Sequence, residues 1–363
     1  MSLTLICSER FSDHQTPPGH PERVERAEVM NAVAAQARAR GHQVTAPHPA
    51  SVEQLARVHA PEYVARIAET GGRAVALDAD TYTSAESYGI ALLAAGAAVD
   101  AVKLVMSPER SEDRSLQLPG RVRPSGRPEV NAALAMVRPP GHHAERARAM
   151  GFCLFNNVAV AAAHARSEGA KRVAIVDYDV HHGNGTQHIF ESDPTVLYVS
   201  LHQFPFYPGT GAADEIGRGE GTGFTVNLPL EAGAVDEDYR LAFSEVVVPV
   251  LSEYDPDLLL VSAGVDAHER DPLAGMRLTS GAFAAMTSEL RRVAEQRSDG
   301  RLVLVTEGGY DLRALAESLE GVVESLAAGS SDTPWPAAAV ASDRGRVAVN
   351  AAKRALSAYW KLG

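Results

Sequence analysis

The chain alternates between short, continuous apolar runs and longer segments with helical spacing, most regularly from about residue 130 onward. The apolar runs predict strands at residues 3–7, 132–137, 172–178, 195–201, 224–228, 258–262 and 302–306. The helical segments lie at residues 21–41, 52–59, 62–68, 85–105, 237–253, 280–297 and 313–326, after Asn157 and Gly185, and from about Arg346. Apolar strands that alternate with helices are typical of a mostly parallel sheet with helices on both faces, so we predict an α/β fold.

The length of 363 residues, of which 45% are hydrophobic, is enough for a large core. We expect residues 1–363 to form a single domain. Residues 107–128 are charged and contain several Pro and Gly, and we interpret them as an exposed insertion. Residues 329–363 follow the last strand and helix of the regular pattern, and we expect this C-terminal extension to pack on the domain.

The chain is acidic, with a net charge of -12 and an isoelectric point near 5.6. This charge argues against nucleic acid as a partner and would suit cationic substrates, although many proteins are equally acidic. Cys7 and Cys153 are too few for a disulfide framework and fit a reducing compartment. Because the sequence shows no signal-peptide pattern and no apolar run of membrane-spanning length, we expect a cytoplasmic protein that binds no membrane.

Residues 173–187 carry the strongest chemical signal. An apolar run ends there at Asp177, and Asp179 and His181 follow it. Side chains alternate along an extended chain, so Asp179 and His181 point to the same side. A carboxylate and an imidazole at this spacing can share one metal ion.

Reactive groups also follow other strands, and together they occupy residues 141–143, 177–181, 262–266 and 307–310. Ligands of parallel sheets bind beyond the carboxyl ends of the strands, and packing alone explains such a concentration poorly. Asp179, His181 and Asp266 would supply three ligands and leave positions open for water and substrate, which suits a catalytic zinc ion. The alternative for Asp266 is a cap of the following helix.

Two histidines and a tyrosine are candidate catalytic groups. Tyr310 follows two glycines, and its phenol stays protonated at neutral pH, so it could donate to a developing oxyanion; the alternative is an ordinary half-buried tyrosine. His142 and His143 follow a rigid Pro-Pro-Gly turn and would transfer protons to and from the reacting groups. Asp177 and Asn184 are candidate partners of the two rings, and because a carboxylate raises the pKa of an imidazole more than a neutral amide does, the two histidines should titrate differently.

Five ordered motifs resemble the zinc-dependent histone deacetylase superfamily, which includes acetylpolyamine amidohydrolases and histone-deacetylase-like amidohydrolases. They are RPPGHHAERARAMGFCLFNNVAVA, VDYDVHHGNGTQHIF, VSLHQFPFYPGTG, SAGVDAHERDPL and TEGGYDL. The resemblance runs from HPERVERA to the GGY loop. Asn184, where class I members have Asp, and the stretch RPPGHHA together resemble the class II branch. The resemblance implies the arginase/deacetylase fold, with a central, mostly parallel eight-stranded sheet.

The resemblance implies removal of acetyl or other short acyl groups from acetylated amines, chiefly acetyl-lysine side chains. It assigns one Zn²⁺ per chain to Asp179, His181 and Asp266, the tandem catalytic histidines to His142 and His143, and the oxyanion-stabilising residue to Tyr310. The residues matched to the family's substrate channel are Gly151 and Phe152 in one wall, Tyr207 in the opposite wall and Leu273 at the apolar rim. Asp80 matches the carboxylate that holds the substrate backbone; without the resemblance it would be interpreted as a turn or capping residue.

Two structural sites for K⁺ or Na⁺ are also implied by the resemblance, both with hard oxygen ligands. The residues matched to the inner site are Asp177, Asp179, His181, Ser200 and Leu201. The residues matched to the outer site are Phe190, Asp193, Val196 and Phe224.

Other functions stay open from the sequence. An arginase-like binuclear manganese hydrolase would need a carboxylate two residues after His181, where the chain has Gly183. A non-catalytic acetyl-ligand-binding or acetoin-utilisation-type protein would be expected to lack a metal ligand, a histidine or the tyrosine, and all are present. Leu273 argues against an acetylpolyamine amidohydrolase, whereas Tyr207 and the acidic surface permit one. The expected partner is an acetylated small molecule or peptide, and a homo-oligomer is compatible with the sequence.

Overall fold

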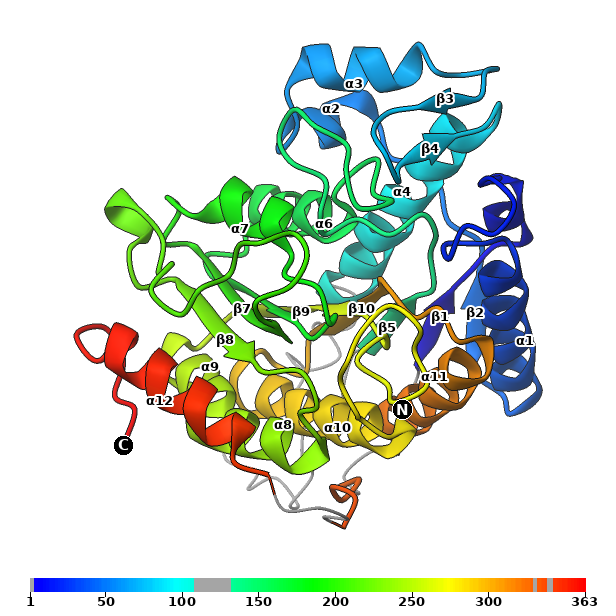
Figure 1. The fold of residues 1–363 in the computed structure, drawn as a ribbon. Coiled ribbons are helices and arrows are strands. Elements are labelled where there is room, and N and C mark those ends of the chain that lie inside the picture. The colour runs from blue at the N-terminus through cyan, green and yellow to red at the C-terminus, as the bar shows by residue number, and fades with distance from the viewer. Residues whose placement is uncertain (1–2, 108–131, 329–331, 338–341) are drawn as a thin grey trace, which may run out of the picture.

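The computed structural model describes residues 3–107, 132–328, 332–337 and 342–363. The exposed insertion predicted at residues 107–128 lies, apart from Ser107, outside the described residues. An eight-stranded, fully parallel sheet forms the centre of the molecule, with the strand order β2-β1-β5-β10-β9-β6-β7-β8 (Figure 1). Its strands are β1 (Thr4–Ile6), β2 (Gln43–Thr45), β5 (Ala132–Ala135), β6 (Val173–Asp177), β7 (Val196–Gln203), β8 (Thr225–Leu230), β9 (Leu258–Ala263) and β10 (Leu302–Thr306).

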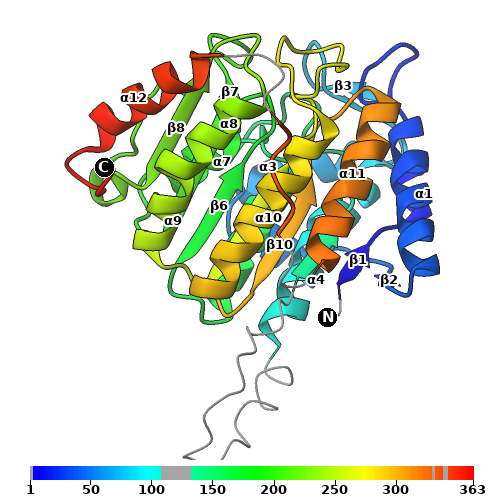
Figure 2. The same cartoon turned by 90° about the horizontal axis from the view of Figure 1, so that it is seen from below.

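Helices cover both faces of the sheet, as the sequence predicted (Figure 2). One face carries α1 (Glu25–Ala39), α8 (Asp236–Ala242), α9 (Val248–Tyr254), α10 (Ser280–Arg297), α11 (Leu312–Ala327) and α12 (Arg344–Leu356). The other carries α2 (Val52–Ala56), α3 (Pro61–Ala68), α4 (Ser87–Met106), α6 (Asn157–Ser167) and the end of α7 (Asn184–Phe190).

The two faces form separate hydrophobic cores because side chains alternate along each strand. On β5, Leu134 packs into the core on the α1 side, whereas Ala133 and Ala135 pack into the core on the α4 side. Both sides of each central strand are therefore buried, which explains why the strands appear in the sequence as continuous apolar runs.

The helix α4 is long and apolar enough to cross a membrane by length and composition, contrary to the expectation that no segment of the chain is. Of its most apolar window, 67% is buried inside the protein. The helix packs against α6 and β5, and its small residues allow this close packing. Its composition is accordingly that of a core helix.

Three local features differ from the sequence predictions. The strand β2 is only three residues long and follows the turn at Gly41, too short a run to stand out as a strand. The helix expected at residues 237–253 is interrupted by a π-helical turn, Phe243–Val247. Pro249 follows this turn and lacks an N–H to continue the α-helical hydrogen bonds, which accounts for the local change in helix type. The small antiparallel pair β3 (Val75–Ala76) and β4 (Tyr82–Thr83) was not predicted either.

Candidate functional site

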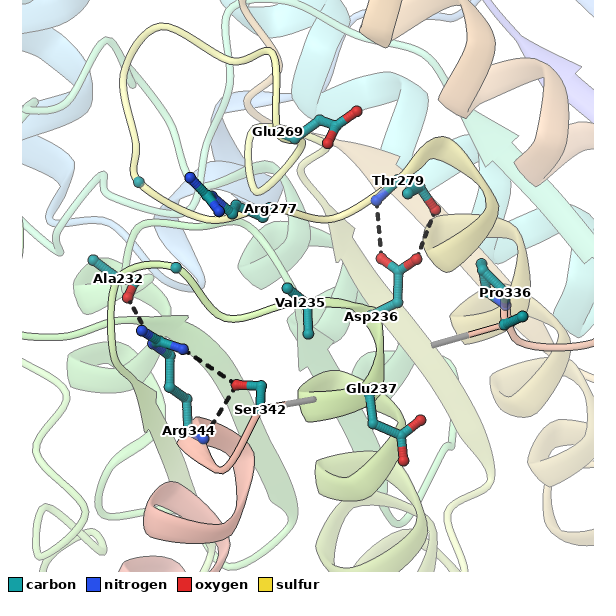
Figure 3. A pocket seen from close by; sticks show the side chains of 13 residues that line it. Ala232, Val235, Asp236, Glu237, Glu269, Arg277, Thr279, Pro336, Ser342 and Arg344 are labelled. Carbon is teal, nitrogen blue, oxygen red and sulfur yellow. Dashed lines mark hydrogen bonds between the residues drawn. The ribbon is translucent and has the colours of Figure 1, made fainter. Parts of the chain in front are cut away.

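A hollow of about 560 Å³ lies between the loop after β8, residues 269–279 and the start of α12 (Figure 3). Asp236 in this hollow accepts hydrogen bonds from the N–H and the hydroxyl group of Thr279. Arg344 donates to the carbonyl oxygen of Ala232. The described lining contains no histidine or cysteine and none of the predicted site residues, so this hollow is not the place of the predicted chemistry.

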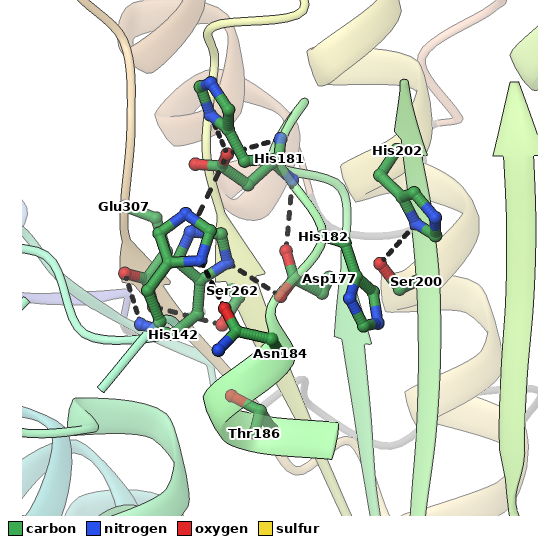
Figure 4. Close-up of polar contacts among 12 residues, drawn as sticks. His142, Asp177, His181, His182, Asn184, Thr186, Ser200, His202, Ser262 and Glu307 are labelled. Atoms are coloured by element: carbon green, nitrogen blue, oxygen red, sulfur yellow. Dashed lines mark hydrogen bonds and ion pairs between the residues drawn. The ribbon is translucent and has the colours of Figure 1, made fainter. Parts of the chain in front are cut away.

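The four reactive stretches predicted from the sequence meet instead at the carboxyl edge of the sheet (Figure 4). They follow β5, β10, β9 and β6, which are consecutive in the sheet. The register places Asp177 of β6 level with Ser262 of β9 and with Ser200 of β7. In the sequence β9 and β10 come after β8, but in the sheet they lie between β5 and β6. This topology brings residues 263–310 beside residues 138–184.

Three side chains form a group that could hold a metal ion, and we call it the metal-capable group: Asp179, His181 and Asp266. One ligand atom from each residue lies within 4.8 Å of the others. The Nδ1 atom of His181 is 3.1 Å from Oδ1 of Asp179 and 3.1 Å from Oδ2 of Asp266. The backbone N–H groups of Gly308 and Val180 donate to Asp179 and Asp266, respectively, and so orient the two carboxylates.

The charges around this group fit a bound cation. Both carboxylates are fully buried, and within the described chain no Lys or Arg side chain forms a hydrogen bond or an ion pair with them. Burial and the charge of Asp179 raise the pKa of Asp266 to about 7. Burial lowers the pKa of His181, but the two carboxylates outweigh burial and raise that pKa to about 10. Two buried carboxylates that share one imidazole favour a cation, and this set of oxygen and nitrogen donors suits zinc.

The tandem histidines bind different partners through Nδ1. Nδ1 of His142 lies 3.0 Å from Oδ2 of Asp177, and Nδ1 of His143 lies 2.8 Å from Oδ1 of Asn184. The two ring centres are 4.1 Å apart. The Nε2 atom of His142 is 3.7 Å from Oδ1 of Asp179. Both rings therefore lie beside the metal-capable group, and each is oriented by the partner that the sequence predicted.

The two partners give the two rings different acidities. Burial lowers the pKa of His142, but the negative charges of Asp177 and Asp179 outweigh burial and hold this pKa well above its usual value. Burial lowers the pKa of His143 as well, and the charges of His142 and His181 lower it further, to well below its usual value. The pKa values of the two rings thus shift in opposite directions, in the sense that their partners predict.

Asp177 has hydrogen-bond partners besides His142. Besides His142, it accepts from the Tyr198 hydroxyl group at 3.0 Å and from the Asp179 N–H at 3.1 Å. A Cβ atom on Gly183 would lie 2.3 Å from Oδ2 of Asp177 and 2.4 Å from the Tyr198 oxygen, so no side chain fits there. The position at which an arginase-like site would need another carboxylate is thus closed, which argues against a binuclear metal centre.

Tyr310 lies buried after β10, beside the metal-capable group. Its N–H donates to Oδ2 of Asp271 at 2.7 Å. Burial raises the pKa of its phenol well above the usual value, although the charge of Arg26 opposes this effect. The hydroxyl group therefore stays protonated and able to donate a hydrogen bond.

The predicted channel residues lie around His143. A Cβ atom on Gly151 would lie 2.4 Å from Cδ2 of His143, so only glycine fits beside this ring. Phe152 has a φ of 68°, which is uncommon for a residue with a side chain, and its ring centre is 5.8 Å from that of Tyr310. The ring of Tyr207, a 37% exposed residue, lies 5.1 Å from His143.

Asp80 is connected to this wall through Thr81. The Thr81 hydroxyl group donates to Oδ1 of Asp80 and accepts from the N–H of Phe152, both at 3.1 Å. Nε2 of His20 lies 2.9 Å from the Asp80 carbonyl oxygen. The carboxylate that accepts the N–H groups of the turn is Asp78, so Asp80 is not the turn-forming group.

Leu273 and Tyr310 both line a hollow of about 690 Å³ beside residues 15–25. The Leu273 N–H donates to Oδ1 of Asp271, whose other oxygen accepts the Tyr310 N–H. Asp271 thus connects the predicted apolar rim to the candidate oxyanion-stabilising residue.

Of the residues matched to the monovalent cations, Asp179 and His181 belong to the metal-capable group itself, and Asp177 ends β6. The others lie around α7, β7 and β8. Ser200 and Leu201 are buried on β7, and Oγ of Ser200 is 2.9 Å from Nδ1 of His202. The carbonyl oxygens of Phe190, Asp193 and Phe224 each accept a backbone N–H, and a second lone pair remains on each. Val196 begins β7. Cation binding by these residues stays a prediction.

Glu307 is the main site residue that the sequence reasoning did not assign. Its Oε2 accepts from the N–H groups of Gly141 and His142 at 2.6 and 3.2 Å, and its Oε1 accepts from the Ser262 hydroxyl group at 3.0 Å. The fully buried carboxylate therefore holds the histidine loop against β9. A charged residue directly after the apolar run of β10 was the signal that could have identified it.

Comparison with known proteins agrees with this geometry. A family model described as the histone deacetylase domain matches residues 20–326. The chain is 37% identical over 331 residues to a probable deacetylase of Archaeoglobus fulgidus, covering 90% of this chain and 87% of that protein. It is 38% identical over 380 residues to the polyamine deacetylase HDAC10 of Homo sapiens, covering 99% of this chain and 53% of that protein.

The crystal structure of the HDA15 HD domain is similar, with a TM-score of 0.86 and 35% identity, covering 99% of this chain and 95% of that chain. The shared fold is the arginase/deacetylase fold. The chain therefore belongs to the histone deacetylase family, in its class II-like branch, and is a deacetylase, a hydrolase that acts on acetylated substrates.

Proposed function

We propose that the protein hydrolyses the acetamide group of acetylated amines, with acetyl-lysine side chains as its main substrates and one Zn²⁺ per chain held by Asp179, His181 and Asp266. The observation that carries this proposal is the position of His142, whose Nδ1 binds Asp177 while its Nε2 lies 3.7 Å from a carboxylate of the metal-capable group. A ring in this position is within reach of a water molecule placed at that group.

Zinc, when bound, would polarise the acetamide carbonyl and lower the pKa of a water molecule at the site. Of His142 and His143, one ring takes the proton from the attacking water, and one returns a proton to the leaving amine. The protonated hydroxyl group of Tyr310 donates a hydrogen bond to the tetrahedral oxyanion. The C–N bond then breaks, and acetate and the free amine leave.

The acetyl-lysine preference rests on the rim and the channel. Gly151, Phe152 and Tyr207 would enclose the aliphatic part of the substrate, and Asp80 would bind its backbone N–H groups. Leu273 places an apolar group, not a carboxylate, at the rim, and an apolar group does not select a polycation. Similarity to a protein named polyamine deacetylase makes acetylpolyamines the second candidate class. K⁺ or Na⁺ at the two matched sites would have a structural role.

The test is acetate release from an acetyl-lysine peptide, acetylputrescine and acetylspermidine at matched concentrations, before and after chelation and with zinc returned. We expect zinc-dependent turnover of all effective substrates and a higher kcat/KM for the peptide. Turnover of the polyamines alone would contradict the acetyl-lysine preference. Absence of acetate from every substrate would contradict the proposed activity.

A further inference from the structure

Two residues extend the hydrogen-bonded chain of His143 from the site to the surface. Nδ2 of Asn184 donates to Oε1 of Glu145 at 2.5 Å, and Nδ1 of His188 lies 2.8 Å from the same oxygen. Asn184 is buried, whereas the side chains of Glu145 and His188 are 22% and 37% exposed. Glu145 follows the histidine pair in the sequence, and His188 lies one helical turn after Asn184 on α7.

The donor and acceptor chemistry of these groups fixes the direction of every bond. An ionised carboxylate only accepts hydrogen bonds, so Glu145 selects the NH₂ end of the Asn184 amide. The amide oxygen then faces His143 and can only accept, so Nδ1 of His143 carries the proton. In the neutral ring Nε2 is therefore left without a proton and can act as a base.

The amide of Asn184 has no other strong reason to keep this orientation. Its oxygen and nitrogen ends have nearly the same shape, so the group can turn over with little steric change. Besides Glu145, its nitrogen contacts only the sulfur of Met150 at 3.4 Å among the described residues, and a thioether is a weak acceptor. After such a turn, the NH₂ group would face Nδ1 of His143 and favour the ring with its proton on Nε2, which cannot act as a base there.

We propose that Glu145 is a positioning residue of the deacetylase reaction, because its carboxylate locks the amide of Asn184 and thereby keeps the proton of His143 on Nδ1. The kinetic part of this inference rests on the proposed function, whereas the position of the proton does not. The pKa of His188 is raised, chiefly by its hydrogen bond to Glu145.

The backbone of Glu145 is held independently of its side chain. Its N–H donates to the carbonyl oxygen of Arg148, and its carbonyl oxygen lies 3.0 Å from Nδ1 of His59. A substitution of the side chain should therefore leave the loop in place and act on Asn184. Glu145→Met removes the acceptor at similar volume, and Glu145→Gln keeps an oxygen that can accept from Asn184. Glu245→Met is the matched control, because the Glu245 side chain is 26% exposed and lies on the π-helical turn, away from the site.

The experiment is ¹⁵N NMR of the full, zinc-loaded chain labelled at histidine, with the His143 signals identified by their absence in His143→Gln. We expect a protonated Nδ1 and an unprotonated Nε2 in the wild type and in Glu145→Gln, and a mixture of both ring forms in Glu145→Met. On an acetyl-lysine peptide, kcat of Glu145→Met should fall about tenfold or more at little change in KM, and Glu145→Gln should recover most of it. Glu245→Met should behave as the wild type in both measurements.

A wild-type ring with its proton on Nε2 would overturn the inference, even if Glu145→Met does not fold. An unchanged ring form and unchanged kcat in a folded Glu145→Met would overturn it as well. A wild-type protein without activity on any acetylated amine would contradict the proposed function, while the spectra would still decide the position of the proton.

Discussion

The guanidinium group of Arg26 lies 5.0 Å from the ring centre of Tyr310. It also donates hydrogen bonds to the carbonyl oxygens of Gly309 and Glu307, at 2.8 and 2.5 Å. One cation on α1 therefore fixes both the ring of Tyr310 and the backbone turn in front of it. Because this turn also presents the Gly308 N–H to Asp179, Arg26 connects the candidate oxyanion-stabilising residue to the metal-capable group.

Replacing Tyr310 by Phe should reduce kcat on an acetylated amine by about 10²–10³-fold, because one donor to the developing oxyanion is lost. The ring and its contact with Arg26 remain, so the fold should be unchanged, and metal analysis should still find zinc. Tyr359→Phe, at an exposed tyrosine outside the site, is the control. Unchanged turnover in Tyr310→Phe would remove this residue from the mechanism.

Arg26 is itself held by Glu22, whose fully buried carboxylate also binds Arg138. Oε1 of Glu22 accepts from Arg26 at 2.9 Å and from Arg138 at 2.7 Å, and Oε2 accepts from Arg138 at 2.8 Å. Glu22→Gln leaves two buried guanidinium groups without their carboxylate and should cost about 3–5 kcal/mol in the free energy of unfolding. Glu28→Gln, on the exposed side of α1, should cost little.

The same network predicts a dependence of stability on pH. Burial raises the pKa of Glu22, but the charge of Arg138, the hydrogen bond with His14 and the charge of Arg26 outweigh burial and hold the pKa well below its usual value of 4.5. A carboxyl group with a lowered pKa in the folded state stabilises the protein above pH 4.5 and loses this contribution as the pH falls through its folded-state pKa. Urea unfolding from pH 7 downward should therefore show a smaller loss of stability below pH 4.5 in Glu22→Gln than in the wild type; parallel curves would contradict this.

Zinc should stabilise the folded chain, because the ligands are brought together only in the fold. We expect added zinc to raise the Tm of the metal-free wild type and metal analysis to find one ion per chain. Asp266→Asn should lose most of the zinc-dependent rise in Tm. Asp236→Asn, which changes a buried carboxylate of the other hollow, should keep it. Two bound transition-metal ions per chain would favour a binuclear centre and contradict the closed position at Gly183.

A carboxylate at the rim should shift the substrate preference toward polyamines. Leu273→Glu would add a negative charge beside the hollow that Tyr310 lines. Relative to Leu273→Gln, which is polar but neutral, the ratio of kcat/KM for acetylspermidine to that for an acetyl-lysine peptide should rise roughly two- to fivefold, as for a partly exposed ion pair. The effect should weaken at high salt. An unchanged ratio would mean that the substrate cation does not pass position 273.

Much of the fold and of the candidate site can be predicted from the sequence, because the central strands are buried on both faces. A continuous apolar run followed by Asp179 and His181 identifies a strand, its end and a reactive rim at once, and the parallel direction places all such ends at one edge. The metal-capable group and the partners of His142 and His143 follow from this local logic. Strand β2 and the π-helical turn could not be predicted in this way. A strand of three residues and a single proline in a helix are too weak as sequence patterns to identify either element.

Long-range contacts of buried charges were decided only by the tertiary structure. Glu307 faces the histidine loop because β9 and β10 lie between β5 and β6 in the sheet. Nothing in the local sequence determines this strand order. Arg26 and Glu22 meet Tyr310 and Arg138 across more than a hundred residues of chain, since a buried charge must find its partners wherever the fold brings them. The sequence by itself determined which side chains stand at the reactive edge, and the tertiary structure decided which neighbours hold them there.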